Sequence, residues 1–370
     1  MTPPNIVVLS GEGDPNSPRT WSGTPSHLIA ALRGIGCDVT GFNLFPKRSI
    51  RAAMTALSLA VGSGREFRRT RLFTVYSGLL TPKSIPPNAV FLHMGLCTIP
   101  HKRKKGDGSH AIYLDTTFNL TSKYTVTPCS DAIRRKYEQF EVDCIKAADR
   151  IFTVSECAMH DLINHYSVPP EKVVAVGTGL GKIRPAESEK DYSARTVLFV
   201  AKQRFIEKGG ELILDGFRLA QLEGPPLKLI VVATEPYRRM VEAIPGALFK
   251  SDLSWRELEA LFNTSSLFAM PAIYEPWGLV YLEALACRTP VLGLNRNALP
   301  EFTQNGKFGF LVDEPTAEAV ASALRDALSD TNRLARMGRT AQQYVQGRYG
   351  WDKTAIRICD ALFNQGSQSH

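Results

Sequence analysis

The sequence has no long apolar run. In 370 residues, no stretch reaches the ~20 consecutive apolar positions that a membrane-spanning helix needs. The N-terminal residues also lack a basic region followed by an apolar core, so no secretory signal is predicted there, and they are typical of a first β-strand. We therefore expect a cytoplasmic protein.

Motifs that hold metals or pair cysteines are missing as well. None of the seven cysteines belongs to a Cys-x-x-Cys pair, which favours buried, reduced thiols over disulfides or structural zinc. The sequence contains no Asp-x-Asp, and we predict no metal site, no divalent metal requirement and no cofactor.

Basic residues outnumber acidic residues in the sequence. The formal net charge is +8, and basic residues cluster in Arg65–Arg71 and in His101–Lys105. Such clusters fit nucleic acid, an acidic membrane surface, a phosphorylated substrate or a simple solvated loop. No helix-turn-helix, zinc-finger or RNA-recognition signature is present, so nucleic acid is not an expected partner. Ile50–Phe73 mixes apolar residues with arginines, and it is compatible with peripheral contact with an anionic membrane at its inner face or with packing on its own domain.

Short β-branched runs alternate with helical patterns along most of the chain. This alternation predicts an α/β protein with parallel, doubly wound sheets of the Rossmann-like kind. A first series of strands is predicted at 6–10, 38–42, 89–93, 111–114, 150–154 and 172–176, and a second at 197–200, 227–232, 267–270, 291–294 and 308–312.

The two series are separated by Gly177–Arg195, which is rich in Gly and Pro at first and then polar and charged. We predict an N-terminal domain at residues 1–178 and a C-terminal domain at 190–348, with a last helix at 350–366 packing back on the first domain. Ligands bind beyond the carboxyl ends of parallel strands, so two such sheets facing each other predict an active site in a central cleft.

The segment from Phe268 to Cys287 carries the most specific motif. An apolar strand is followed by Glu275 and Pro276, and Gly278 then opens an amphipathic helix. The amides of Gly278, Leu279 and Val280 would be unpaired at this helix start, which suits a diphosphate. Glu283 lies five residues along the helix, ~7.5 Å up its axis, within reach of ribose hydroxyls. Either glutamate alone could be a surface or helix-start carboxylate, but together with the Pro and Gly between them they predict a ligand site.

This segment resembles the Glu-x7-Glu motif of retaining GT-B glycosyltransferases, in particular the large family 4, the glycosyl transferases group 1. The resemblance covers most of the second half of the chain and extends weakly into the first. It implies the GT-B fold, a sugar contact by Glu275, diphosphate binding by Gly278, Leu279 and Val280, and ribose binding by Glu283.

A second element of the family precedes this segment. The run Val197 to Gly210 resembles the family's strand followed by Gly-Arg and then Lys-Gly, whose cations neutralise the diphosphate. Lys208 and Gly209 match it, whereas Ala201-Lys202 replaces Gly-Arg, and Arg204 follows two residues later. The second cation is therefore either Lys202 or Arg204.

Two residues of the first half complete the predicted site. Gly23 precedes a helix at the end of a loop rich in Gly, Pro and Asn, and it resembles the family's glycine-containing first loop. Asp115 ends a strand in Tyr-Leu-Asp-Thr-Thr-Phe, where the resemblance implies a contact with the donor sugar. His93 also ends a strand, but it is interpreted as a hydrogen-bonded histidine and not as a catalyst.

The resemblance implies a hexosyltransferase-type enzyme that moves a sugar from a nucleoside-diphosphate sugar to a glycan, lipid-linked or small-molecule acceptor with retention. The predicted catalytic residues are Glu275, Asp115 and Lys208. Two alternatives stay open: another GT-B enzyme such as a sugar-nucleotide epimerase, and a non-catalytic protein that binds a nucleotide sugar or carbohydrate.

Overall fold

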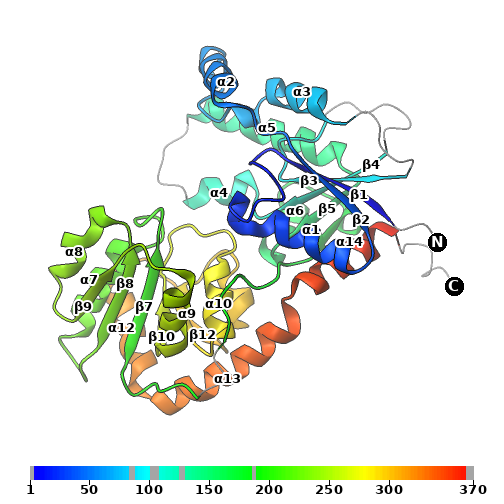
Figure 1. Ribbon diagram of the computed structural model, residues 1–370. Coiled ribbons are helices and arrows are strands. Elements are labelled where there is room, and N and C mark those ends of the chain that lie inside the picture. Colours follow the sequence, from blue (N-terminus) through cyan, green and yellow to red (C-terminus); the bar gives the residue numbers. More distant parts are fainter. Residues whose placement is uncertain (1–3, 83–87, 101–107, 125–129, 186–188, 364–370) are drawn as a thin grey trace. The chain divides into compact units, whose positions relative to one another are not determined.

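The computed structural model describes residues 4–82, 88–100, 108–124, 130–185 and 189–363. They form two compact units, which are labelled in Figure 1 by their elements. Unit 1 contains Met1–Lys123, Thr127–Gly179 and Gly350–His370, and unit 2 contains Tyr124–Val126 and Leu180–Tyr349.

Unit 1 is built on a six-stranded sheet in which every neighbouring pair is parallel. In spatial order its strands are β2 (Asp38–Asn43), β1 (Asn5–Ser10), β3 (Val90–Met94), β4 (Ser109–Leu114), β5 (Arg150–Thr153) and β6 (Val173–Ala175). The central strands are buried along almost their whole length, because helices cover both faces of a doubly wound sheet.

The helices of unit 1 include the last one of the chain. They are η1 (Thr20–Gly23), α1 (Thr24–Gly34), α2 (Arg48–Ala60), η2 (Phe67–Arg69), α3 (Arg71–Leu80), α4 (Phe118–Tyr124), α5 (Asp131–Ala147), α6 (Glu156–Asn164), η3 (Pro170–Lys172) and α14 (Trp351–Phe363). Helix α14 packs against α1, and the His27 and Trp351 rings stack with centroids 5.7 Å apart. The last helix of the chain therefore belongs to the unit in which the chain begins.

Unit 2 has the same architecture. Its parallel sheet runs β12 (Gly309–Val312), β11 (Val291–Leu294), β10 (Leu267–Ala269), β7 (Thr196–Ala201), β8 (Lys228–Ala233) and β9 (Ala247–Lys250). Its helices are α7 (Gly210–Ala220), η4 (Glu235–Tyr237), α8 (Arg238–Glu242), α9 (Trp255–Thr264), α10 (Leu279–Ala286), α11 (Leu299–Thr303), α12 (Ala317–Ser329) and α13 (Thr331–Arg348).

The predicted pair of doubly wound parallel sheets is confirmed. Strand β9 was absent from the predicted series because it lies at a sheet edge, where only Phe249 of its four residues is buried. The described residues of the predicted linker 177–195 contain no helix or strand. None of the described helices is both long enough and apolar enough to span a bilayer.

Candidate functional site

Two loops of unit 2 begin where its strand order reverses. Strand β7 has β8 on one side and β10 on the other, so the chain turns to opposite sides after these strands. Ligands of doubly wound sheets bind beyond the carboxyl ends of the strands at such a point. The loops after β7 and β10 carry most of the predicted donor-site residues.

The two loops are tied together by backbone contacts. The N–H of Ile273 donates to the carbonyl of Glu207 at 2.8 Å. Gly209 has φ +80°, and a Cβ there would lie 2.1 Å from the carbonyl oxygen of Pro271. Only glycine fits this position, because a side chain would clash with backbone as well as strain φ. The glycine of the Lys208-Gly209 pair therefore has a packing role.

Lys208 and Glu275 meet across these loops. Lys208 Nζ lies 3.4 Å from Glu275 Oε2, and the side chains are 23% and 17% exposed. Both side chains are partly exposed, so the pair is accessible to a charged ligand. The structure thus brings together two of the three residues predicted to be catalytic.

Helix α10 begins as the motif predicted. Gly278 is its N-cap residue at φ +79°, and a Cβ there would lie 2.6 Å from the Tyr281 ring. The Tyr281 hydroxyl donates to the carbonyl of Met270 at 2.5 Å and fixes the helix start to the end of β10. In the described part of the chain, the N–H groups of Gly278, Leu279 and Val280 make no protein hydrogen bond. They are available to an anion, which the helix dipole also attracts.

Glu283 is buried, with 9% exposure, on the inner face of α10. Its carboxylate accepts hydrogen bonds from the N–H groups of Lys182 and Ile183, and a Cβ on Gly181 would overlap it. Burial raises the pKa of Glu283 to about 7, against the opposing effect of these hydrogen bonds and of nearby lysines. Glu283, which is predicted to bind ribose, thus also holds residues 182 and 183, close to the point where the chain enters unit 2.

Lys202 and Arg204 differ in what they contact. Arg204 has φ +56°, lies over the Tyr274 ring at 5.6 Å and donates to the Tyr274 carbonyl at 3.4 Å. Lys202 and Lys182 lie on the ring of Trp255 at 5.4 and 5.3 Å, and Trp255 itself is 52% exposed. The positive charge of Lys202 also acts on Glu283. Arg204 is therefore held on the loop that follows β10, while Lys202 stands beside the predicted ribose position.

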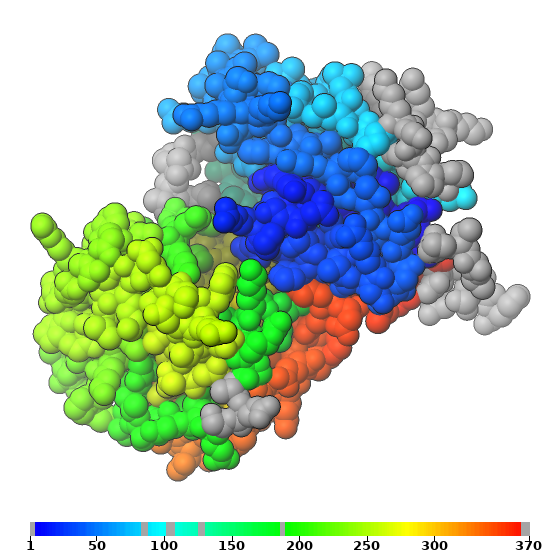
Figure 2. Space-filling model, viewed as in Figure 1, coloured from blue at the N-terminus to red at the C-terminus, as the bar shows by residue number. Residues whose placement is uncertain are grey.

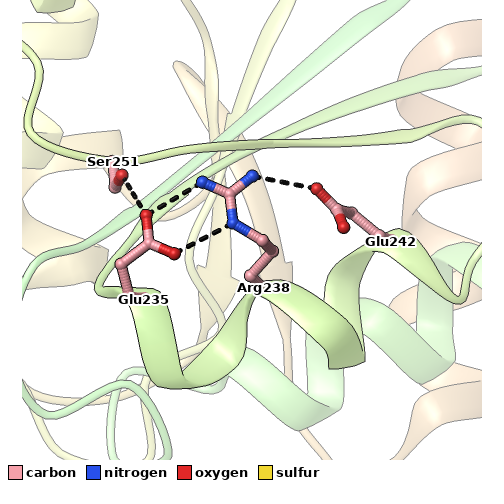
Figure 3. A network of polar contacts seen from close by, with 4 residues as sticks. All are labelled: Glu235, Arg238, Glu242 and Ser251. Atoms are coloured by element: carbon pink, nitrogen blue, oxygen red, sulfur yellow. Dashed lines mark hydrogen bonds and ion pairs between the residues drawn. The ribbon is translucent and has the colours of Figure 1, made fainter.

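A polar network holds the ends of β8 and β9 at the same edge of the sheet (Figure 3). The Arg238 guanidinium donates twice to Glu235, at 2.8 and 2.9 Å, and once to Glu242 at 3.0 Å. The Ser251 hydroxyl donates to Glu235 at 2.6 Å, and these bonds lower the pKa of Glu235 to about 2. No sequence motif indicated this network, because Ser251 follows a different strand from the other three members.

Gly23 and Asp115 lie at the carboxyl edge of the sheet of unit 1. Gly23 is the N-cap residue of α1 at φ +84°, after Trp21 and Ser22, which also have positive φ. Asp115 directly follows β4 and is half-buried. Burial, and secondarily the charge of Asp115, raises the pKa of Tyr113. The Trp21 and Tyr113 rings meet edge to face, with their centroids 6.0 Å apart. The segment before Gly23 therefore contacts the strand that ends before Asp115.

Buried carboxylates behind Asp115 were not found from the sequence. Glu141 accepts from the Phe118 N–H at 2.8 Å, and Asp161 accepts from the Asn119 side-chain amide at 2.6 Å. Burial raises the pKa of Glu141. Both acids are far from Asp115 in sequence, and no local pattern links them to the strand end that they support.

The remaining sequence predictions concern His93, the two basic clusters and a metal site. His93 is fully buried and its ring nitrogens meet Thr98 and His110 at 2.9 and 2.8 Å, as expected for a hydrogen-bonded histidine. The cluster Arg65–Arg71 lies on η2 and the start of α3. His101–Lys105 lies outside the described residues. Among the residues that are described, no group of three or more His, Cys, Asp or Glu side chains could hold a metal ion.

The second half of the chain is similar to known glycosyltransferases. Residues 184–344 match the family described as Glycosyl transferases group 1. A D-inositol 3-phosphate glycosyltransferase of Streptomyces avermitilis is 28% identical over 256 residues, which cover 62% of this chain and 54% of the relative. The corresponding protein of Corynebacterium glutamicum is 28% identical over 264 residues, with coverages of 64% and 61%. The chain spans about half the length of the curated relatives it matches.

Solved structures share the fold at low identity. A sucrose-phosphate synthase from Thermosynechococcus elongatus superposes with a TM-score of 0.73 at 16% identity, over 98% of both chains. WaaG, a glycosyltransferase involved in lipopolysaccharide biosynthesis, superposes with a TM-score of 0.66 at 14% identity, over 97% of this chain and 99% of its own. The chain therefore has the GT-B fold, and its residues 184–344 match the family model of the group 1 glycosyl transferases.

Proposed function

We propose that this protein is a retaining, metal-independent glycosyltransferase that moves a sugar from a nucleoside-diphosphate sugar to a hydroxyl group. The acceptor is a glycan, a lipid-linked molecule or a small molecule. The observation that carries the proposal is the pairing of Lys208 with Glu275 beside the free amides that begin α10. The family match and the names of the curated relatives support the same reaction class.

The proposal assigns each part of the donor to one feature of unit 2. The diphosphate is bound by the amides of Gly278, Leu279 and Val280, since a helix start combines free N–H donors with the positive end of the dipole. Lys202 and Lys208 neutralise its charge.

The rest of the donor is assigned to three carboxylates and a glycine. Glu283 accepts from the ribose hydroxyls, and Glu275 holds the transferred sugar. We extend the sugar contact to Asp115 and the close backbone approach to Gly23, both of unit 1.

The chemistry follows from where charge develops. The acceptor oxygen forms a bond to the anomeric carbon on the face from which the diphosphate leaves, and the bond from that carbon to the diphosphate oxygen breaks. The acceptor proton passes to the departing diphosphate. Lys208 stabilises the leaving negative charge, and this electrostatic contribution is usually the largest in such reactions. Glu275 supports the sugar without forming a covalent bond to it.

A two-stage experiment tests this function. A thermal-shift screen of UDP, GDP, ADP and their sugars identifies the donor, because a ligand at about 100 times its Kd stabilises by ~2.7 kcal/mol. The stabilising donor is then incubated with acceptor mixtures in the presence of EDTA, and nucleotide release and the anomeric configuration of the product are measured. Acceptor-dependent release with retention is expected.

The alternatives give other results in the same experiment. A sugar-nucleotide epimerase would convert the donor sugar without any dependence on acceptor. A non-catalytic binding protein would be stabilised by the donor and would release no nucleotide. Release that EDTA abolishes would reject metal independence.

We also propose that the basic region of unit 1 makes peripheral contact with an anionic membrane. Ile50–Phe73 lies on α2, η2 and the start of α3, and it combines arginines with exposed apolar side chains. Flotation with vesicles that contain anionic lipid is expected, and flotation with neutral vesicles is not. Nucleic acid is not expected to bind, which filter binding with generic DNA and RNA checks.

A further inference from the structure

The face of unit 1 formed by α2, η2 and α3 is both basic and apolar. Residues 48–80 carry six arginines and one glutamate, a net charge of +5, compared with +8 for the whole chain. Figures 1 and 2 show α2 and α3 at the surface at the top of the view. Half of the sixteen exposed large hydrophobic side chains in the described part of the chain lie on this face: Ile50, Leu57, Leu59, Val61, Leu72, Val75, Leu79 and Leu80.

Helix α2 buries little of itself in the unit. Of its thirteen residues, only Met54 and Ser58 are buried. Helix α3 is better anchored, since Phe73 is fully buried and the Thr70 side chain caps its start. Contiguous exposed apolar surface that is bordered by charge is typical of sites that contact other molecules or membranes.

Two hollows open on this face, on either side of one ion pair. Arg71 Nη2 lies 3.3 Å from Asp143 Oδ2 on α5, and both residues line both hollows. The first hollow has a volume of about 470 Å³ and the second of about 630 Å³. Each is within the range of roughly 300–1,000 Å³ that small-molecule sites occupy.

The walls of the hollows are apolar in both cases. Leu57, Val61, Leu72 and Phe140 line the first hollow, between α2, α3 and α5. Val75, Gly78, Pro100 and Ala147 line the second, beside the last turns of α3. Aliphatic walls of this kind suit hydrocarbon chains.

The rims of the hollows are cationic. Arg69, Arg71 and Lys136 line the first, and Arg71 and Lys146 line the second. Asp143 is the only carboxylate among the lining residues, and it is already bound by Arg71 and by the Gln139 amide at 2.8 Å. The Arg71 side chain is 81% exposed, so its guanidinium can turn to an anion that approaches between the hollows.

We propose that this face binds an anionic phospholipid of a membrane, with the phosphate at Arg71 and the acyl chains in the two hollows. The basic rim complements the phosphate, and the apolar walls complement the chains. An acidic peptide or a nucleic acid would meet the same charge, but it would leave the aliphatic walls unfilled. The inference deepens the proposed membrane contact from a charged surface to a lipid-binding site, and it does not depend on the glycosyl transfer.

The test uses a lipid that is soluble as a monomer, so that binding does not require a bilayer. Dihexanoylphosphatidylglycerol is titrated below its micellar concentration, and dihexanoylphosphatidylcholine serves as the neutral comparison. The wild-type protein is expected to bind the anionic lipid at least several-fold more tightly, because each arginine near an anionic lipid strengthens binding about fivefold. No binding of either lipid, or equal binding of both, would overturn the proposal.

Two pairs of variants locate the site. Gly78 has an ordinary φ and lines the second hollow, and nothing lies within 4 Å of a Cβ placed on it, so Gly78→Leu adds apolar volume at the wall of that hollow. Gly347→Leu makes the same change on α13, where the space is also open. Arg71→Gln removes the rim cation, and Arg218→Gln removes the cation of another exposed ion pair, with Asp215.

Arg71→Gln is expected to weaken binding of the anionic lipid by about fivefold or more. Gly78→Leu is expected to weaken it as well, because the added side chain takes up space that an acyl chain would fill. Gly347→Leu and Arg218→Gln are expected to bind as the wild type does. Wild-type affinity in both Gly78→Leu and Arg71→Gln would contradict the proposed site. Melting temperature and donor-dependent nucleotide release are measured on the same preparations, so that a fault in folding or in the proposed transfer reaction is recognised separately.

Discussion

Lys208 Nζ and Glu275 Oε2 lie 3.4 Å apart, on two loops that follow different strands of unit 2. The pair is only partly exposed, and it stands where the loops are locked by the contact of Gly209 with Pro271. A cation and an anion held at one point can act on opposite ends of a polarised bond, the lysine on a leaving phosphate and the glutamate on a sugar. Each member should therefore be needed for turnover.

Lys208→Ala is expected to lower kcat by about 100-fold or more, because a positioned donor to developing negative charge contributes that much. Glu275→Gln should lower kcat to a comparable extent while leaving the melting temperature close to that of wild type. Lys228→Ala is the control, since Lys228 is exposed at the opposite end of β8. Turnover by Lys208→Ala within a few-fold of that of the control would contradict the proposal that Lys208 stabilises the leaving diphosphate.

The two cations after β7 should behave differently. Lys202→Gln is expected to weaken nucleoside-diphosphate binding by about tenfold, which corresponds to ~1.4 kcal/mol. Arg204→Gln should change the affinity much less, because the guanidinium of Arg204 is held on Tyr274. Isothermal titration of both variants with the stabilising nucleotide measures the difference. A larger loss in Arg204→Gln would reverse the assignment.

Gly209 should tolerate no side chain. Gly209→Ala adds a Cβ 2.1 Å from the Pro271 carbonyl at a position with φ +80°, and it should destabilise the protein and abolish donor binding. Gly224→Ala is the matched control, because Gly224 also has positive φ, +95°, but a Cβ there meets nothing within 4 Å. Gly224→Ala therefore measures only the cost of placing a side chain on a residue with positive φ, which is about 1–2 kcal/mol. Denaturant unfolding should show a clearly larger loss for Gly209→Ala, and equal losses would disprove the close packing of the loops.

Glu283 should make stability depend on pH. Its pKa is raised from 4.5 to about 7 in the folded protein, so between these values the folded state binds a proton that the unfolded state has released. The free energy of unfolding contributed by Glu283 is therefore complete below pH 4.5 and is lost as the pH rises through about 7, by about 3 kcal/mol.

The comparison with Glu283→Gln isolates this effect. The variant does not titrate, so the free energy of unfolding of wild type minus that of Glu283→Gln should fall across this pH window. Lys190, whose burial lowers its pKa to about 7, is present in both proteins and cancels from the difference. Urea unfolding of both proteins at several pH values measures this difference in the free energy of unfolding. A difference that is independent of pH would exclude the raised pKa of Glu283.

The local geometry of the proposed donor site was predictable because three of its residues are close in the chain. Glu275, Gly278 and Glu283 lie on one loop and the helix that follows it, so their spacing alone places them around a helix start. Lys208 was proposed from the resemblance of Lys208-Gly209 to the family's Lys-Gly element, and the structure adds the close approach of Gly209 to Pro271. By contrast, the choice between Lys202 and Arg204 depends on the rings of Trp255 and Tyr274, which come from other loops.

Strand β9 was missed for a related reason. It has a single buried side chain, Phe249, because it lies at the edge of the sheet. Its local sequence therefore lacks the apolar pattern that indicates a strand.

The sequence by itself determined the alternation of strands and helices, and hence the parallel sheets, because apolar periodicity and turn residues act over a few positions. It also determined the start of α10 at Gly278, which is a local feature. Only the tertiary structure decided the partners of the charged groups: the linker amides of Lys182 and Ile183 on Glu283, and the hollows beside Arg71. The physical reason is that burial and hydrogen bonding depend on segments far apart in the chain, whose meeting no local pattern encodes.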